Sequence, residues 1–276
     1  MTSQQIYPAI AGDTRLYVII GDPVAHTRAP EVFNPLFLDR GVNAVMVPMQ
    51  VKAEDLEIAF EGLQAIANLD GIIVTIPHKL AMTKLVDEVL PMGHQVGAIN
   101  AVRRLADGRW VGDIFDGRGF IAGLMEQGHS IAGRSALLVG AGGAGRAIAF
   151  ALAEAELAAL TLYDIESVKA ARLASDIIAV YPDIWAHCDA PNALGHDIVI
   201  NATPLGMNHN DPYPVAPDTF HPRMLVADIV MKPEVTSLLT AARARGCKTH
   251  IGRHMLEGQV EAIADFFELP MPQISL

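Results

Sequence analysis

A glycine-rich segment in the middle of the chain carries the clearest chemical signal. It reads Gly140-x-Gly142-x-x-Gly145, directly after the apolar run ALLV and at the start of a stretch with helical spacing. The first glycine permits a tight turn, the second lets the backbone approach a pyrophosphate, and the third lets helix and strand pack closely. The N-terminus of the helix then offers free N–H groups to the anion. We predict that this segment, Gly143 and Ala144 included, binds a dinucleotide; the alternative is a glycine-rich packing turn.

An acidic residue, Asp164, ends the next predicted strand, about 20 residues after the glycine segment. An acid at this place accepts a hydrogen bond from the ribose 2′-hydroxyl of NAD and repels the 2′-phosphate of NADP. The residues that follow are Ile-Glu-Ser-Val, and the first basic residue after them is Lys169. The sequence therefore favours NAD, with NADP as the second choice. If Asp164 instead caps the next helix, the choice stays open.

Two polar turns follow apolar runs in the N-terminal third of the chain. Residues 21–34 read GDPVAHTRAPEVFN and come directly after LYVII. This turn is either a polar connection between two elements or the edge of a site that holds a small polar molecule. Lys79 follows Pro77 at the end of another predicted strand, and ligand sites of α/β folds open at such strand ends.

The composition limits the classes of protein to consider. The chain has 276 residues, of which 51% are hydrophobic and 6% aromatic, and its net charge is −11. This length allows one large domain or two ordinary ones, and an aliphatic core suits parallel strands covered by helices. The acidic balance argues against nucleic acid as a partner. The two cysteines are far apart and no cluster has metal-ligand spacing, so we expect neither a disulfide framework nor a metal site.

The compartment is predicted from what the sequence does not contain. The stretch MTSQQIYPAIAGDTR has no basic segment followed by an apolar core, so no secretory signal is visible. Since no run of about 18 apolar residues occurs, we expect no membrane span. We therefore expect a cytoplasmic protein that acts on a small molecule as a monomer or homodimer.

Predicted strands and helices alternate along most of the chain, which indicates βαβ units and a largely parallel sheet. Residues 101–113 interrupt this order, because AVRRL and RWVGD flank Ala106-Asp107-Gly108 as in a hairpin. The simplest partition is one α/β domain over residues 1–115 and a second over 116–251. The predicted strands are 16–20, 43–51, 70–77, 136–140, 160–164, 197–203 and 224–230. The predicted helices are 29–41, 53–67, 78–90, 116–128, 143–156, 167–180, 234–245 and 254–269.

Seven short segments together resemble motifs of the shikimate/quinate dehydrogenase family. GDPVAHTRAP resembles G-x-P-[IV]-x-H-S-x-S-P, GIIVTIPHK resembles G-x-N-V-T-x-P-x-K, and GDIFDGRG resembles G-x-N-T-D-G-x-G. VGAINA, GAGGAGRA, NATPLGM and GRHMLEGQ also stand in the family order. The resemblance implies an N-terminal α/β substrate domain with a mostly parallel sheet, completed by residues 252–276. It further implies a Rossmann domain that binds NAD(P), with a cleft between the two domains.

The resemblance also implies roles for individual residues. Lys79 matches the catalytic lysine and Asp116 its partner, and a lysine beside a carboxylate can handle the proton of an alcohol that loses hydride. Taken alone, Lys79 is typical of a solvated turn and Asp116 of a helix N-cap. The positions that bind substrate are matched by Thr27, Thr75, Asn100 and Gln259. The positions that bind cofactor are matched, outside the glycine segment and Asp164, by Asn201, Thr203, Met207 and Met255, and both methionines would otherwise be assigned to the core.

The departures from the family pattern concentrate at the substrate positions. The family's second serine is Ala29 here, and its first serine is Thr27. The other departures are Ile73 for asparagine, Ile114 and Phe115 for Asn-Thr, and Met231 for the tyrosine of D-x-x-Y-x-P. A lost neutral hydrogen bond costs about 0.5–1.5 kcal/mol. We therefore expect weaker affinity for shikimate than in the family at large, with the machinery for hydride transfer intact.

The sequence thus predicts an NAD(P)-dependent dehydrogenase that reversibly oxidises a hydroxyl of shikimate, quinate or a related cyclic hydroxy acid, as in the interconversion of shikimate and 3-dehydroshikimate. One alternative is a non-catalytic sensor of NAD(P) or a metabolite on the same fold, which retention of both Lys79 and Asp116 disfavours. Another is a two-domain dehydrogenase of the methylene-tetrahydrofolate type, which the segments HTRAP and GRHMLEGQ disfavour. The sequence leaves the exact substrate and a biosynthetic or catabolic role open.

Overall fold

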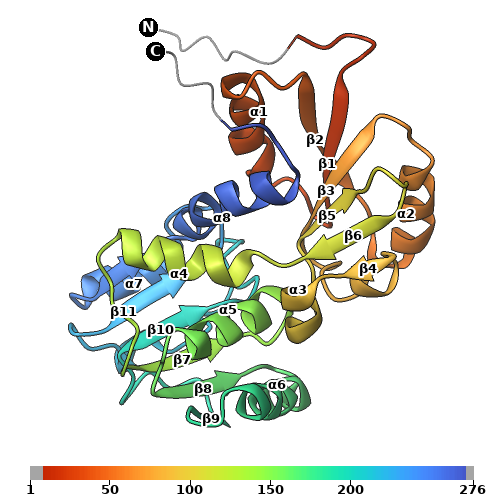
Figure 1. The fold of residues 1–276 in the computed structure, drawn as a ribbon. Helices are drawn as coiled ribbons and strands as arrows, with labels where there is room; N and C mark the ends of the chain where they lie inside the picture. The colour runs from red at the N-terminus through yellow and green to blue at the C-terminus, as the bar shows by residue number, and fades with distance from the viewer. Residues whose placement is uncertain (1–8, 272–276) are drawn as a thin grey trace, which may run out of the picture. The chain divides into compact units, whose positions relative to one another are not determined.

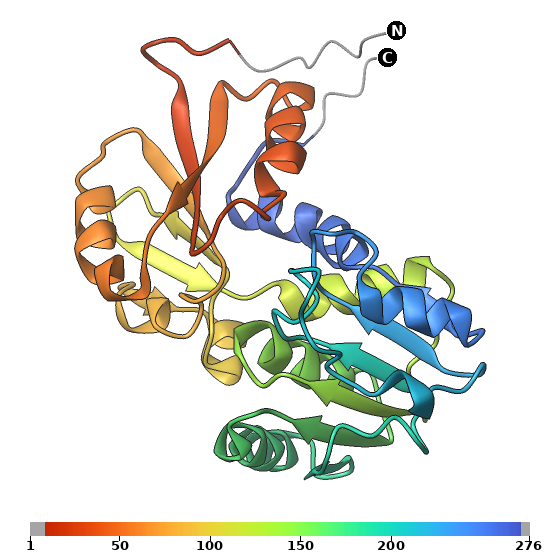
Figure 2. The same ribbon diagram turned by 180° about the vertical axis from the view of Figure 1, so that it is seen from behind.

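In the computed structural model, which describes residues 9–271, the chain forms two α/β units (Figures 1 and 2). Unit 1 comprises the described residues up to Phe115 together with those from Val260 onward, and unit 2 comprises Asp116–Gln259. All of 252–276 was expected in the first domain, whereas this division places 252–259 in unit 2. Residues 1–8, on which part of the expectation about a secretory signal rests, lie outside the described residues.

Unit 1 is built on a six-stranded sheet with the order β2-β1-β3-β5-β6-β4. Strand β1 pairs in parallel with β2 and β3, while β5 is antiparallel to both β3 and β6. Strands β5 and β6 form the predicted hairpin, and β4 runs parallel to β6. The elements are β1 (Arg15–Gly21), α1 (Ala29–Asp39), β2 (Ala44–Gln50), η1 (Ala53–Asp55), α2 (Leu56–Gln64), β3 (Leu69–Val74), η2 (Met82–Lys84), β4 (Glu88–Val89), α3 (Pro91–Val96), β5 (Ala101–Arg104) and β6 (Trp110–Asp113).

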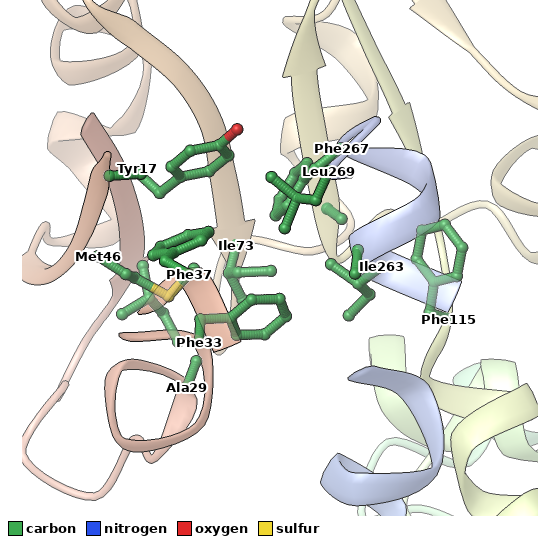
Figure 3. Close-up of a cluster of buried hydrophobic side chains, with 14 residues drawn as sticks. Tyr17, Ala29, Phe33, Phe37, Met46, Ile73, Phe115, Ile263, Phe267 and Leu269 are labelled. Atoms are coloured by element: carbon green, nitrogen blue, oxygen red, sulfur yellow. The ribbon is translucent and has the colours of Figure 1, made fainter. Parts of the chain in front are cut away.

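Strand β1 is buried on both faces, which explains why LYVII is apolar without alternation. Tyr17 and Ile19 join a cluster with α1 and the end of the last helix, part of which is drawn in Figure 3. Val18 and Ile20 point to the opposite face and join a cluster that contains Trp110. Successive side chains of a strand alternate between the two faces of a sheet, so a central strand with two covered faces must be apolar throughout.

The helix predicted over residues 78–90 is wrong. This stretch contains only the short 3-10 helix η2 and the two-residue strand β4. The backbone N–H of Asp87 donates to the Trp110 carbonyl (2.9 Å), and that of Leu90 donates to the Gly112 carbonyl (2.8 Å). Pairing with β6 therefore uses backbone N–H groups that would otherwise form hydrogen bonds within a helix. The spacing of apolar residues carries no information about a partner strand so distant in the chain.

Unit 2 is built on a parallel six-stranded sheet with the order β12-β11-β10-β7-β8-β9. Helix α6 packs against β8 and β9, as Figure 2 shows. The edge strands β9 and β12, which are short, were not predicted from the sequence. The elements are α4 (Asp116–Glu126), β7 (Ser135–Val139), α5 (Gly143–Glu154), β8 (Ala159–Tyr163), α6 (Ser167–Val180), β9 (Trp185–Cys188), β10 (Ile198–Asn201), η3 (Pro217–Thr219), β11 (Leu225–Asp228), α7 (Ser237–Ala244), β12 (Lys248–His250) and α8 (Gly252–Phe266).

Glycines let helix α4 and the first half of α8 pack so closely that the backbone of each helix contacts that of the other. A Cβ atom placed at Gly119 would lie 2.4 Å from the Met255 carbonyl oxygen, and one at Gly258 would lie 2.5 Å from the Gly119 carbonyl oxygen. Side chains at these positions would force the two helices apart. This approach explains why residues 252–259 belong with unit 2.

We expect Glu261→Ala to lower the free energy of unfolding by about 2 kcal/mol. The Arg40 side chain is fully buried, and its Nη2 pairs with Glu261 Oε2 at 2.6 Å, although the Glu261 side chain is 68% exposed. Removing one partner of a fully buried pair costs about 3–5 kcal/mol because the other charge stays buried, and access of water to this site reduces that figure.

The matched control for this prediction is Glu257→Ala on the same helix. Glu257 pairs with the exposed Arg253, and such surface pairs contribute about 0–1 kcal/mol. Urea unfolding curves of both variants measure the difference. Equal losses would contradict the importance assigned to the buried arginine.

In unit 2, the rings of His129 and His254 both contact the ring of His250. His250 is buried, its Nδ1 lies 3.2 Å from Nδ1 of His254, and its ring packs against those of Phe120 and His129. Burial, together with positive charge on His254 and His129, lowers the pKa of His250 to about 3. The unfolded chain, with a pKa of 6.5, therefore binds a proton that the folded chain excludes. The contribution of the neutral His250 to the free energy of unfolding is therefore complete above pH 6.5 and is lost as the pH falls toward 3.

We expect wild type to lose about 2 kcal/mol of stability from this group between pH 7 and pH 5. His250→Leu removes the titrating group, so its free energy of unfolding should fall less over the same interval. His209→Leu, on an exposed loop, is the control and should behave like wild type. Urea unfolding at the two pH values tests this, and an unchanged pH dependence in His250→Leu would refute it.

Candidate active site

The glycine segment turns from β7 into α5 as predicted, and its three motif glycines have different reasons to be glycine. Gly140 has φ +105°, and a Cβ at Gly145 would lie 1.9 Å from the Gly140 carbonyl oxygen, so the fold itself requires both. Gly142 has an ordinary φ of −74°, is exposed, and a Cβ there would meet nothing within 4 Å. The fold therefore gives no reason for glycine at 142, whereas the approach of a pyrophosphate to the start of α5 would.

Asp164 holds the glycine segment against the end of β8. Its Oδ2 accepts a hydrogen bond from the Ala141 N–H (2.8 Å), and its Oδ1 accepts one from the Glu166 N–H (2.9 Å). The N-cap residue of α6 is Glu166, so the alternative that Asp164 caps this helix is wrong. Each carboxylate oxygen keeps capacity for a second donor, such as a ribose hydroxyl. The next side chain, Ile165, is 91% exposed.

The end of β10 and the loop after it carry three of the predicted cofactor residues. Asn201 is fully buried, and its Oδ1 accepts hydrogen bonds from the N–H (3.1 Å) and hydroxyl (2.7 Å) of Thr203. Its Nδ2 donates to the Leu205 carbonyl (2.9 Å). Asn201 thus shapes the loop from inside, whereas Thr203 and Met207 are half-buried. Met255, the remaining predicted cofactor residue, is buried on α8 beside α4.

Asp228, which matches the aspartate of the family pattern D-x-x-Y-x-P, was given no role from the sequence. This carboxylate is buried at the end of β11 and accepts a hydrogen bond from Asn201 Nδ2 (3.0 Å). The signal in the sequence was an acidic residue that ends a strand of a parallel sheet, where functional groups of α/β folds gather.

In unit 1, three predicted site residues lie on adjacent segments. The carbonyl of Lys79 accepts from the Ile99 N–H (2.9 Å), and the Val74 N–H donates to the Asn100 carbonyl (2.7 Å). Thr75, Lys79 and Asn100 are therefore brought together by backbone pairing beside the end of β3. Lys79 is only 9% exposed, so it is not the solvated turn residue that its sequence context alone suggested. Asn100 is buried too, and its Oδ1 accepts from the Phe115 N–H (2.9 Å).

The polar turn after β1 reaches the same part of unit 1. A Cβ at Gly21 would lie 2.4 Å from Cγ2 of Thr75, so the glycine permits this approach. The hydroxyl of Thr27 donates to the Val24 carbonyl (2.8 Å) within the turn. Arg28 pairs with Glu31 at 2.9 Å. The turn is therefore internally bonded, and the predicted contact of Thr27 with substrate stays a prediction.

Asp116 and Gln259 lie in unit 2. Asp116 begins α4, Gln259 lies on α8, and both are buried. A Cβ at Gly119 would lie 2.7 Å from Cβ of Gln259, so close packing of the two helices holds these predicted site residues on neighbouring elements. The predicted site residues are thus divided between the two units, with Lys79 in unit 1.

Three of the departures from the family pattern meet in one place. Ala29, Ile73 and Phe115 all belong to the buried apolar cluster of unit 1 shown in Figure 3. Ile114 is buried as well, whereas Met231 in unit 2 is half-buried. A polar side chain in this cluster would need a hydrogen-bond partner, which its aliphatic and aromatic neighbours do not supply. The replacements are therefore mutually consistent, because each fits the apolar surroundings that the others create.

Comparison with known proteins places the chain in a family. The profile described as shikimate dehydrogenase substrate binding domain matches residues 19–102. A shikimate dehydrogenase (NADP(+)) of Rubrobacter xylanophilus is 38% identical over 256 residues, which cover 90% of this chain and 89% of the relative. This chain belongs to the shikimate dehydrogenase family. The predicted family, its α/β fold and its class as an NAD(P)-dependent oxidoreductase are thereby confirmed, and the methylene-tetrahydrofolate type is set aside.

Solved structures agree with this assignment. A crystal structure of shikimate dehydrogenase in complex with NADP+ has a TM-score of 0.87 and 31% identity, covering 98% of this chain and 95% of that one. The shikimate 5-dehydrogenase of Listeria monocytogenes in complex with shikimate and NAD has a TM-score of 0.82 and 29% identity, covering 97% and 96%. Both cofactors thus occur among the relatives, as the prediction of NAD with NADP as second choice allows.

Two other features were considered from the sequence, a membrane span and a metal site. Within residues 9–271, no helix combines the length and the hydropathy that crossing a membrane requires. In that same part of the chain, no three histidine, cysteine, aspartate or glutamate residues are grouped as metal ligands would be.

Proposed function

We propose that this chain catalyses the reversible NAD(P)-dependent oxidation of a ring hydroxyl of shikimate, quinate or a related cyclic hydroxy acid. The observation that carries the proposal is the burial of Lys79 beside Asn100 and Thr75 in a chain that belongs to this family. Lysine is rarely buried in proteins, and the end of a strand in an α/β fold is where functional side chains gather. The proposed partners are this substrate and the cofactor, with the chain acting as a monomer or homodimer in the cytoplasm.

The proposed chemistry assigns the proton to Lys79. In the oxidising direction the substrate hydroxyl gives its proton to the Lys79 amine while its carbon loses a hydride, and in the reducing direction the ammonium returns that proton to the carbonyl oxygen. Asp116 is the proposed acidic partner of Lys79 in this proton transfer. Asn100, Thr75, Thr27 and Gln259 orient the substrate through hydrogen bonds to its hydroxyl and carboxylate groups.

The residues of unit 2 suit a dinucleotide. The start of α5 would hold the pyrophosphate over Gly142, where the fold leaves room, and Asp164 would accept from the adenosine ribose. Thr203 and Met207 would hold the nicotinamide end. The bound cofactor supplies the hydride acceptor, and the protein's part is to position it.

We further propose that NAD is the preferred cofactor, although the Rubrobacter relative is named for NADP(+). After β8 the chain presents the carboxylates of Asp164 and Glu166 around the exposed Ile165. The nearest cation along the chain, Lys169, is already paired with Glu166. A 2′-phosphate would therefore meet negative charge that no neighbouring cation along this segment offsets.

The expected result is a higher kcat/KM with NAD than with NADP in wild type. Ile165→Arg, which adds a guanidinium able to bind phosphate, should raise kcat/KM for NADP about tenfold. Ile58→Arg adds the same charge at an exposed position of α2 and serves as the control. A wild-type preference for NADP would overturn the proposal.

The experiment that tests the function is a substrate panel assayed with both cofactors. The panel contains shikimate, quinate, aromatic hydroxy acids and simple hydroxy acids. We expect turnover with a cyclic hydroxy acid. Tight binding of NAD without turnover of any member would instead support the sensor alternative.

A further inference from the structure

One buried carboxylate of unit 2 has no part in the proposed chemistry. Asp228, at the end of β11, is 1% exposed, and its Oδ1 accepts from Asn201 Nδ2 (3.0 Å) and from the Val230 N–H (3.1 Å). Its Oδ2 accepts from the Thr236 hydroxyl (2.7 Å). Across residues 9–271 the carboxylate forms no ion pair, so its charge is balanced by hydrogen bonds alone.

These three hydrogen bonds join three separate segments of unit 2. Asn201 holds the loop after β10 through Thr203 and Leu205. Val230 belongs to the segment after β11, and the fully buried Thr236 caps α7 by accepting from the Leu239 N–H (3.3 Å). Asp228 is therefore the common acceptor on which the β10 loop, the β11 segment and the start of α7 converge.

Thr236 also packs directly against the loop after β10. Gly206 has φ +102°, and a Cβ there would lie 3.3 Å from Cγ2 of Thr236. Loop and helix start are thus packed as well as bonded through Asp228. Because Met207 follows Gly206, a displacement of Thr236 would also displace Met207, a predicted cofactor residue.

A carboxylate is a costly choice for this position. Burial raises the pKa of Asp228 to about 6, so at neutral pH the protein holds it in its charged form against that cost. An asparagine would offer an oxygen to Asn201 and Val230 and would avoid burying a charge. A group that lowers stability and is nevertheless present is typical of a functional site.

We propose that Asp228 is a positioning residue for cofactor binding: its carboxylate, acting through Asn201 and Thr236, holds the loop that carries Thr203 and Met207 in the conformation that binds the dinucleotide. This inference rests on the proposed function, because that function makes the β10 loop a cofactor loop. The groups that face Asp228 are an amide, a backbone N–H and a hydroxyl, none of which titrates near neutral pH. The charged residues of the following segment, Lys232 and Glu234, are exposed.

The test is titration of the full-length protein with NADH, followed by fluorescence, for wild type and for Asp228→Asn. We expect the variant to be at least as stable as wild type to urea at pH 8 and yet to bind NADH about tenfold more weakly, equivalent to about 1.4 kcal/mol. In wild type the Kd should rise as the pH falls through about 6, since protonation removes one acceptor site. That rise should be absent in Asp228→Asn.

A second pair of variants separates positioning from folding. Thr236→Val removes the donor to Asp228 at nearly constant volume, while Thr236→Ser keeps it. We expect the valine variant to bind NADH several-fold more weakly and the serine variant to bind like wild type. Unchanged affinity and an unchanged pH profile in Asp228→Asn, or equal behaviour of the two Thr236 variants, would overturn the inference.

The proposed function can fail separately from this inference. Wild type that binds NADH without oxidising any hydroxy acid would refute the dehydrogenase, and the binding titrations would still decide the role of Asp228. Wild type that binds neither NADH nor NADPH would refute both.

Discussion

Lys79→Ala is expected to lower kcat by about 10²–10⁴-fold on the best substrate, with the Kd for NADH unchanged. The reason is chemical: the variant retains the β3 end, Asn100 and the cofactor unit but lacks the group that accepts and returns the hydroxyl proton. Lys79→Arg should be similarly inactive, because a guanidinium does not release its proton at working pH. Steady-state kinetics with NADH titration measure both quantities.

The matched control is Lys84→Ala, which removes an exposed lysine of the adjacent 3-10 helix. It should leave kcat within about twofold of wild type, since surface substitutions rarely matter. Because Lys79 is buried, each variant also needs a urea unfolding curve. Near-normal turnover by a folded Lys79→Ala protein would show that the proton is handled elsewhere and would remove the proposed mechanism.

The second large effect is expected in the glycine segment, where two alanine substitutions should fail in different ways. Gly145→Ala places a methyl group 1.9 Å from the Gly140 carbonyl oxygen, so β7 and α5 can no longer pack as they do. We expect a loss of stability above about 3 kcal/mol or failure to fold. Urea unfolding and far-UV circular dichroism measure this outcome.

Gly142→Ala should leave the fold intact, because a methyl group there meets nothing within 4 Å and the φ of −74° suits alanine. We expect its Kd for NADH to rise at least about tenfold, since the methyl group would occupy the space of the pyrophosphate. Each variant controls the other, one testing the fold and the other the ligand. Normal NADH binding by Gly142→Ala would show that the pyrophosphate does not require a glycine at this position.

Features that depend on neighbours along the chain could be predicted from the sequence. The turn at Gly140 and its contact with Gly145 lie within one short segment, so the spacing of the glycines was enough to predict both. The hairpin over 101–113 has the same local origin, with Gly108 at φ +89° in its turn. The uninterrupted apolar run of β1 is typical of a strand that is covered on both faces. Family motifs added Lys79 and Asp116, whose types alone did not distinguish a site from a turn and a helix cap.

Features that depend on partners far apart in the chain appeared only in the tertiary structure. Residues 78–90 have helical spacing, but their N–H groups at Asp87 and Leu90 bond to strand β6. Asp164 could have capped a helix, and only the position of Ala141 shows that it bonds to the glycine segment. The convergence of Asn201 and Thr236 on Asp228 likewise requires three strand and helix ends to meet. Local chemistry is determined by the order of residues, whereas the pairing of buried polar groups is decided when the sheet brings distant segments together.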